Sequence, residues 1–251
     1  MLRHVGEATS ERLAALLEPI EAELVSKLAP EPGERWLDIA TGTGATAIRA
    51  ARAGAEVSAI DSSELIAEKV RHDAEDAGLT IGVDNGSVEY LPYDDGSFDI
   101  LASNFGLVYV ADHANVAAEL ARIARPGARL GFTAWRPNPK LGELYRRFTD
   151  EPIEGREAYE WGREDHVEQM LADDFELDFH DGTLWIDARS GEEIWELFST
   201  TASPVVSVLG RLDEASAEQF HRSFVELYEE YRSDGGIRAP RRYLLVLGRR
   251  R

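Results

Sequence analysis

Apolar and polar positions along residues 34–135 alternate between short apolar runs and longer amphipathic stretches. The apolar runs are typical of buried strands, and they span residues 36–39, 57–60, 80–83, 98–102 and 129–134. The amphipathic stretches predict helices at residues 44–53, 63–77 and 112–124. Strand and helix alternating at this spacing indicate βαβ units and a parallel sheet, with crossovers that are almost always right-handed.

The flanking segments follow a different pattern. Leucines and isoleucines at three- and four-residue steps predict a helix over residues 10–28, which the Pro/Gly-rich residues 30–33 end. After Trp135, helices are predicted at residues 141–149, 164–172, 191–202 and 213–232. Residues 175–188 alternate either as one strand or as a tight hairpin around Asp181 and Gly182. Residues 243–248 form a strongly apolar last strand.

Composition narrows the function classes. The chain has 47 acidic and 27 basic residues, a net charge of −20, so it repels phosphate backbones and a nucleic-acid partner is not expected. Cysteine is absent, which excludes disulfides and thiolate metal sites, and no metal is expected. No apolar run reaches membrane-spanning length and no secretory signal precedes the first helix. We therefore expect a cytoplasmic protein without a membrane partner.

A glycine turn is the strongest candidate for a ligand site. Gly42 and Gly44 lie between the first predicted strand and a helix, and they let the backbone approach a ligand closely. Asp61 ends the next strand, where a carboxylate can accept both hydroxyls of a ribose. In open parallel sheets, ligands bind just beyond the carboxyl ends of the strands.

Two ligand classes compete for this turn. Residues 42–47 satisfy a loose G-x-G-x-x-A pattern, which also occurs at nicotinamide dinucleotide sites. Asp38 favours the other class, because a carboxylate at the mouth of the loop disfavours a pyrophosphate and favours a cationic amine. S-adenosylmethionine has an amine, a sulfonium and a ribose but no phosphate. The alternative for Asp38 is that it caps the turn and touches no ligand.

Four motifs in order extend this interpretation. Residues 37–44, Asp61, residues 86–99 and residues 120–130 together resemble the class I S-adenosylmethionine-dependent methyltransferases, in particular the branch of quinone-biosynthesis and small-molecule enzymes. The resemblance is dense over residues 34–135 and holds only in outline beyond them. It implies an α/β, Rossmann-like, doubly wound fold with a mostly parallel seven-stranded sheet, an antiparallel C-terminal strand and helical insertions.

The resemblance also implies roles for individual residues. Asp38 would lie near the methionine amino group of the cofactor S-adenosyl-L-methionine, and Asn104 would lie beside its reactive methyl. The other implied cofactor contacts are the turn residues Ala40, Thr41, Gly42 and Gly44, the ribose ligand Asp61, and the adenine neighbours Ser62, Ser87 and Val88.

Two positions depart from the family pattern. The family often has glycine where this chain has Ala40, and a methyl group there is strained if φ is positive. The family often has aspartate where this chain has Ser87, although a serine can still accept one hydrogen bond from the adenine amine. These departures predict an altered cofactor affinity more than its loss.

Candidates for the chemistry follow the fourth strand. Methyl transfer mainly requires that an acceptor be held close and aligned, with a general base only for a weak, protonated nucleophile. His113 is the candidate base; the alternative is that Asp112 and His113 simply begin a helix, with Asp112 as N-cap. The candidate substrate contacts are Phe105, Tyr109, Trp135 and Trp161, each of which is otherwise an ordinary core aromatic.

Residues 1–251 are predicted to form one methyltransferase domain, because the last strand must return to the core. Within it, residues 1–33 would be an N-terminal helical lid, residues 34–135 the cofactor-binding core, and residues 136–251 the substrate-side helices plus the last strands. The expected partner is a small-molecule methyl acceptor. Two alternatives stay open: an NAD-dependent oxidoreductase, and a non-catalytic relative that keeps the fold.

Overall fold

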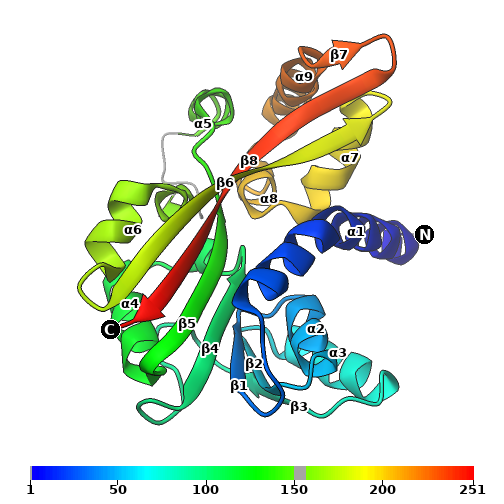
Figure 1. Ribbon diagram of the computed structural model, residues 1–251. Helices are drawn as coiled ribbons and strands as arrows, with labels where there is room; N and C mark the ends of the chain where they lie inside the picture. Colours follow the sequence, from blue (N-terminus) through cyan, green and yellow to red (C-terminus); the bar gives the residue numbers. More distant parts are fainter. Residues whose placement is uncertain (1, 150–156) are drawn as a thin grey trace. The chain divides into compact units, whose positions relative to one another are not determined.

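The computed structural model describes residues 2–149 and 157–251 (Figure 1). Its strands are β1 (Arg35–Ile39), β2 (Glu56–Asp61), β3 (Ile81–Asn85), β4 (Phe98–Asn104), β5 (Ala124–Trp135), β6 (Phe175–Ala188), β7 (Arg232–Ser233) and β8 (Gly236–Arg250). Its α-helices are α1 (Leu2–Leu28), α2 (Ala45–Arg52), α3 (Glu64–Asp76), α4 (His113–Ile123), α5 (Pro139–Arg146), α6 (Glu164–Leu171), α7 (Gly191–Thr201), α8 (Ser203–Leu209) and α9 (Glu214–Glu229). Two 3-10 turns are η1 (Leu107–Tyr109) and η2 (Glu157–Gly162).

The strands form one sheet in the order β3-β2-β1-β4-β5-β8-β6, and the short β7 pairs with β8. Strands β1 to β5 pair in parallel with their neighbours, whereas β8 runs antiparallel to β5. The predicted Rossmann-like fold is therefore confirmed, with β7 as an additional short strand. Because the chain progresses outward from β1 to β3 and then returns to β4, the carboxyl ends of β1 and β4 form the switch point where such sheets bind ligands.

Residues 175–188 form the single strand β6, so the hairpin alternative is wrong. A Cβ placed on Gly182 would lie 2.0 Å from the ring of Tyr243. The glycine therefore makes room for an aromatic ring and does not turn the chain. The predicted strand at residues 243–248 is the middle of the longer β8.

The predicted helices differ from the structure mainly at their ends, as two cases show. Helix α1 begins at Leu2, eight residues before the predicted start. The predicted helix over residues 191–202 ends at Thr201, and a separate α8 follows with Pro204 in its first turn. Proline suits the first turn of a helix but cannot continue one, which explains the break.

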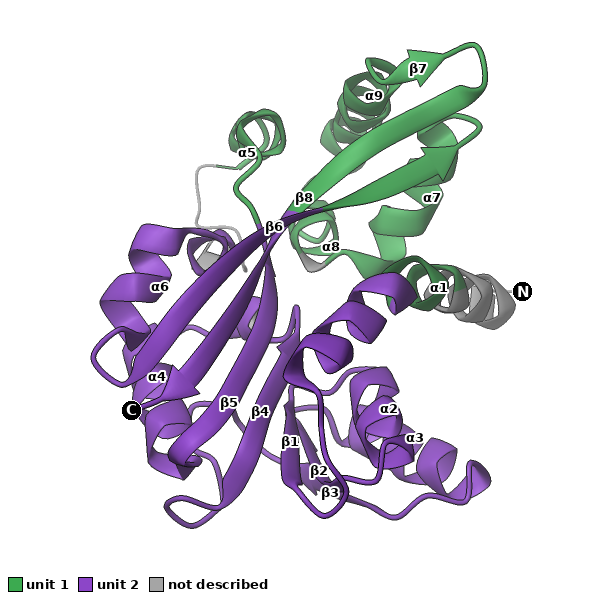
Figure 2. Cartoon of the chain, in the orientation of Figure 1, with its two compact units in different colours: residues 1–17, 136–156, 183–242 green, residues 18–135, 157–182, 243–251 purple. Residues whose placement is uncertain are grey.

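The chain divides into two compact units (Figure 2). The larger comprises residues 18–135, 157–182 and 243–251, and the smaller comprises residues 1–17, 136–156 and 183–242. The larger unit holds β1 to β5, and all candidate site residues belong to it. Because β6, β8 and α1 each run from one unit into the other, the single-domain boundaries stay a prediction.

The sheet of the larger unit is covered on both faces. The Phe132 ring of β5 contacts Trp161, with ring centroids 5.6 Å apart. A Cβ on the neighbouring Gly131 would lie 2.9 Å from Leu24 and from Leu28 of α1. Since successive strand residues face opposite sides, α1 covers one face of the sheet and η2 covers the other.

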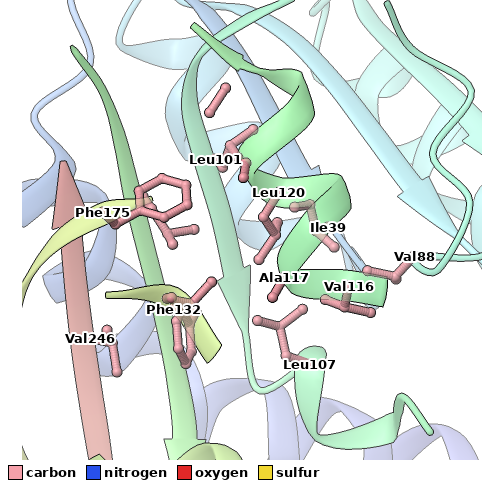
Figure 3. Packing of buried hydrophobic residues seen from close by; sticks show 14 of the residues in the cluster. Ile39, Val88, Leu101, Leu107, Val116, Ala117, Leu120, Phe132, Phe175 and Val246 are labelled. Carbon is pink, nitrogen blue, oxygen red and sulfur yellow. The ribbon is translucent and has the colours of Figure 1, made fainter. Parts of the chain in front are cut away.

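Each unit has its own hydrophobic core. The core of the larger unit fills the face of the sheet beneath α4 (Figure 3), with Ile39, Leu101, Val116, Leu120, Phe132, Phe175 and Val246 among its members. The core of the smaller unit includes Ile194, Val205, Phe220, Phe224 and Ile237. None of the helices in the described ranges is long and apolar enough to cross a membrane.

Candidate functional site

The chain leaves β1 through a turn in which Ala40, Gly42 and Gly44 have φ values of 51°, 54° and 74°. This left-handed region suits glycine and strains alanine. Gly44 is needed for a second reason, because a Cβ there would lie 2.9 Å from Cγ1 of Val70. A Cβ at Gly42 would meet no atom within 4 Å. The turn therefore leaves open space beside Gly42, as a ligand-binding turn requires.

Asp38 lies beneath this turn and is only 1% exposed. Its Oδ2 accepts hydrogen bonds from the Thr41 hydroxyl at 2.6 Å and from the Ala47 N–H at 3.1 Å, so the carboxylate joins β1 to α2. Burial raises the pKa of Asp38 to about 7. The two hydrogen bonds oppose this rise in pKa, and the negative charges of Glu21 and Asp61 add to it. Asp38 therefore has a turn-holding role, and it is poised to lose a proton near neutral pH.

Asp61 ends β2 and is 7% exposed. Its Oδ2 accepts from the Gly42 N–H at 3.1 Å, and its Oδ1 accepts from the Ser63 N–H at 3.0 Å. The carboxylate thus links the turn after β1 to the N-terminus of α3. Each carboxylate oxygen keeps a second lone pair for a further donor.

The strand ends next to Asp61 are more open. Ser62 and Ser87 are exposed, and the Ser87 Oγ accepts from the Glu89 N–H at 3.2 Å. The Val88 side chain is 7% exposed and packs near Val116 (Figure 3), so any ligand contact of Val88 comes from its backbone.

Sequence reasoning missed Leu65, which is 78% exposed in the first turn of α3. The buried residues of α3 are Ala67, Val70 and Ala74, so Leu65 lies off the face that packs on the sheet. Because ligand sites are lined mainly by apolar side chains, this leucine four residues after Asp61 is a candidate ligand contact. A leucine outside the apolar stripe of an amphipathic helix was the available signal.

Asn104 ends β4 beside β5, and Phe105 directly follows the strand. The Thr133 hydroxyl donates to the Asn104 Oδ1 at 2.7 Å. Phe105 has a φ of 57°, and its ring stacks on Trp135 with centroids 3.8 Å apart and planes 11° apart. The Tyr243 ring meets Phe105 edge-on at 6.0 Å. The structure therefore brings Asn104, Phe105 and Trp135 together at the switch point.

A second missed residue is Glu89, in the loop after β3. Its Oε1 accepts from the N–H groups of Ala111 and Asp112, at 3.2 and 3.0 Å. The carboxylate thereby ties the loop after β3 to the loop after β4. Its position inside the motif at residues 86–99 was the only sequence signal.

His113, the candidate base, lies on the face of the sheet opposite to the Asn104 and Thr133 side chains. Its Nδ1 is 2.8 Å from the Nε2 of His166, and its ring centroid is 5.0 Å from that of Trp161. Trp161 is fully buried against Phe132, so it is a core residue in this conformation. Thr133, the register partner of Asn104, faces away from Phe132 by the alternation of strand side chains. The structure therefore does not group His113 and Trp161 with Asn104.

The start of α4 agrees with the alternative that Asp112 and His113 begin a helix, with Asp112 as its N-cap. Asp112 is the N-cap, and its carboxylate accepts from the Asn115 N–H at 3.0 Å. Tyr109 ends η1, and its side chain lies outside the described part of the structure. Within residues 2–149 and 157–251, no group of three or more side chains is suited to hold a metal ion.

The fold is that of a doubly wound α/β protein, and the candidate site residues of the turn after β1 and of Asn104 lie at the switch point where such sheets bind ligands. Residues 37–132 match the family model described as a methyltransferase domain. The chain is 31% identical over 239 residues to an uncharacterised protein of Mycobacterium tuberculosis, covering 91% of this chain and 85% of that protein. It is 36% identical over 124 residues to the ubiquinone/menaquinone biosynthesis C-methyltransferase of Dinoroseobacter shibae, covering 47% and 50% of the two chains.

Among solved structures, the fold is similar to a geranyl diphosphate methyltransferase in complex with S-adenosylmethionine, with a TM-score of 0.61 and 20% identity. That likeness covers 98% of this chain and 90% of the other. The chain belongs to the class I S-adenosylmethionine-dependent methyltransferases. Its cofactor is S-adenosylmethionine, and its reaction is methylation.

The strain at Ala40 gives a first prediction. Replacing Ala40 with glycine should raise the free energy of unfolding by about 0.5–1 kcal/mol. The left-handed conformation costs a non-glycine residue roughly 1–2 kcal/mol, and part of this gain is offset because glycine raises the conformational entropy of the unfolded chain. Urea denaturation at constant m-value measures the change. The matched control is Ala118→Gly on the exposed side of α4, which should lower stability by about 1 kcal/mol. Equal losses in both variants would contradict a strained Ala40.

Proposed function

We propose that this methyltransferase acts on a small-molecule acceptor, with its cofactor held at the carboxyl ends of β1, β2 and β4. The arrangement of Asp61 carries the proposal, because its buried carboxylate holds the N–H groups of Gly42 and Ser63 and keeps lone pairs for two ribose hydroxyls. When bound, the cofactor would supply an electrophilic methyl group on a sulfonium; a lone pair of the acceptor would attack that carbon in line, and the sulfur would leave as the thioether of S-adenosylhomocysteine.

The residues around Asp61 fit the rest of the cofactor. The positive-φ turn formed by Ala40, Gly42 and Gly44 lies beneath the methionine part, and the open space at Gly42 admits it. Thr41 holds this turn through its hydrogen bond to Asp38. On the adenine side, the proposed contacts are Ser62, the exposed Leu65, Ser87 and the backbone of Val88.

Asp38 acts on the cofactor through charge. Its carboxylate is buried, so an ammonium group placed nearby interacts with it strongly and favours its ionised form. The amino group of the methionine part is such a cation. We therefore assign Asp38 two roles: holding the turn through Thr41 and Ala47, and countering the charge of the amino group.

The acceptor lies beside Asn104 in this proposal. The stacked rings of Phe105 and Trp135 form one wall of its site, and the strained backbone of Phe105 supports a functional role because such strain gathers at ligand sites. Tyr109 stays a predicted substrate contact. His113 stays the predicted base, and it would act only on an acceptor that reaches the α4 side of the sheet. In that case Trp161 would pack against the His113 ring and support it.

Charge and relatives support a small-molecule acceptor. The net charge of −20 disfavours polyanionic substrates such as RNA or DNA. The matched Dinoroseobacter relative is named for ubiquinone and menaquinone biosynthesis, which concerns a small molecule, although the match covers about half of each chain. An NAD-dependent oxidoreductase is not favoured, because the buried carboxylate of Asp38 beneath the turn disfavours a pyrophosphate there.

Asp61 provides the direct test of the cofactor site. Replacing Asp61 with alanine should weaken binding of S-adenosylhomocysteine by about 1.5–3 kcal/mol, roughly 10- to 150-fold, because hydrogen bonds to a charged group are lost. Isothermal titration calorimetry measures the affinity, and NAD should not bind. Asp76→Ala at the far end of α3 is the control that removes the same charge. Wild-type affinity in the folded Asp61→Ala variant would show that the site is elsewhere.

Asp38 should release a proton when the cofactor binds. Its pKa of about 7 falls when a cation arrives, so near pH 7 part of the population deprotonates on binding. The affinity for S-adenosylhomocysteine should therefore rise as pH increases toward 8. The heat of binding should differ between phosphate and Tris buffers in proportion to their ionisation enthalpies, and Asp38→Asn should remove that difference. Equal heats in both buffers for the wild type would leave Asp38 only its turn-holding role.

The acceptor class is testable with a labelled cofactor. Tritium from methyl-labelled S-adenosylmethionine should appear in members of a panel of phenols, hydroquinones, enols, carboxylic acids and amines. No label should enter transfer RNA, duplex DNA or protein. Label in a macromolecule would contradict the proposal. Cofactor binding with no transfer to any panel member would favour a non-catalytic relative.

A further inference from the structure

A short hydrogen-bond chain joins the carboxyl ends of β4 and β5. The Phe105 N–H donates to the Thr133 Oγ1 at 3.0 Å, and the Thr133 hydroxyl donates to the Asn104 Oδ1 at 2.7 Å. Asn104 and Thr133 are register partners in the two parallel strands. Thr133 is fully buried, whereas Asn104 is half-buried at the end of its strand.

The direction of these hydrogen bonds determines whether Oδ1 or Nδ2 of Asn104 faces Thr133. The Thr133 hydroxyl has one proton, and within residues 2–149 and 157–251 its acceptor is the Asn104 side chain. If the amide were flipped, Nδ2 would face Thr133 and the hydroxyl proton would be buried without an acceptor, which is costly. Oδ1 therefore faces Thr133. The two Nδ2 protons, which have no partner in the same described ranges, are left for a ligand.

Phe105 fixes the direction of these hydrogen bonds. Its φ of 57° is unusual for an aromatic residue, and such a conformation persists only where the surroundings hold it. The ring is held by its stack on Trp135, and the N–H is held by both the Oγ1 and the backbone oxygen of Thr133. One lone pair of the Thr133 hydroxyl is thus occupied, and its proton is directed to Asn104.

We propose that Thr133 is a positioning residue, which holds the Asn104 amide with its N–H donors toward the position of the transferring methyl. This inference rests on the proposed function, which places Asn104 beside that methyl. An oxygen acceptor can accept these N–H bonds with one lone pair and keep another for the methyl, whereas the neutral amine that would attack has only one lone pair, and its ammonium form has none. The methyl acceptor is therefore an oxygen-bearing nucleophile, such as a phenolate, enolate or carboxylate, and amines are selected against.

Sinefungin tests the amide direction without any acceptor. In this cofactor analogue a carbon with a protonated amine replaces the methylated sulfonium, so it puts an ammonium where the methyl would be. S-adenosylhomocysteine has no group there. The readout is the ratio of the two affinities, sinefungin over S-adenosylhomocysteine, measured by titration calorimetry for each variant.

Three variants separate the possibilities. Asn104→Asp puts a carboxylate beside the ammonium and should raise the ratio about tenfold or more. Thr133→Val removes the hydroxyl but keeps the backbone oxygen that also accepts from Phe105, so the protein should fold. Its freed amide can turn Oδ1 to the ammonium, and the ratio should rise about three- to tenfold. Thr133→Ser keeps the hydroxyl and should leave the ratio within about twofold of the wild type.

The outcomes distinguish this inference from the proposed function. If Asn104→Asp raises the ratio and Thr133→Val does not, Thr133 does not orient the amide and the inference is overturned. If neither variant changes the ratio while S-adenosylhomocysteine binds normally, Asn104 does not face the methyl and the inference is again overturned. If S-adenosylhomocysteine fails to bind the wild type, the cofactor site itself is wrong.

Discussion

The turn after β1 is held from two sides by buried carboxylates, and the geometry of the site depends on those bonds. Asp38 holds it from below through Thr41 and Ala47, and Asp61 holds it from the neighbouring strand through Gly42. These carboxylates thereby satisfy the backbone N–H groups of Gly42 and Ala47 within the protein. The turn stays open at Gly42 while its ends are fixed, which is the preorganised arrangement that cofactor binding favours.

Ala40 and Phe105 both have left-handed backbone conformations where β1 and β4 end, and Gly106 packs directly against Ala40. A Cβ on Gly106 would lie 2.6 Å from the Ala40 Cβ and 2.7 Å from the Ser103 Oγ. The methyl group of Ala40 thus fits only because Gly106 has no side chain. Phe105, which directly precedes Gly106, has its own positive φ. Strain at Ala40 and Phe105 therefore accumulates where β1 and β4 end, close to the proposed methyl position.

Local pattern predicted much of the fold, because parallel strands and amphipathic helices leave distinct periods in the sequence. It was less informative where the decisive contact comes from a distant segment. Gly182 looked like a possible turn residue, and only the ring of Tyr243 explains why it lies within a strand. The same limit applies to Trp161, whose aromatic side chain suited a substrate wall until its burial against Phe132 was known.

The sequence by itself determined the fold class, the family and the segments that meet at the strand ends, since the order and spacing of the motifs can be read directly along the sequence. The tertiary structure alone decided the sign of φ at Ala40, the buried position of Asp38 beneath the turn, and the direction of the Asn104 amide. Each of these depends on a contact with a residue that is not adjacent in the sequence, namely Gly106, Ala47 and Thr133. A linear pattern contains the residues of such contacts but not their pairing.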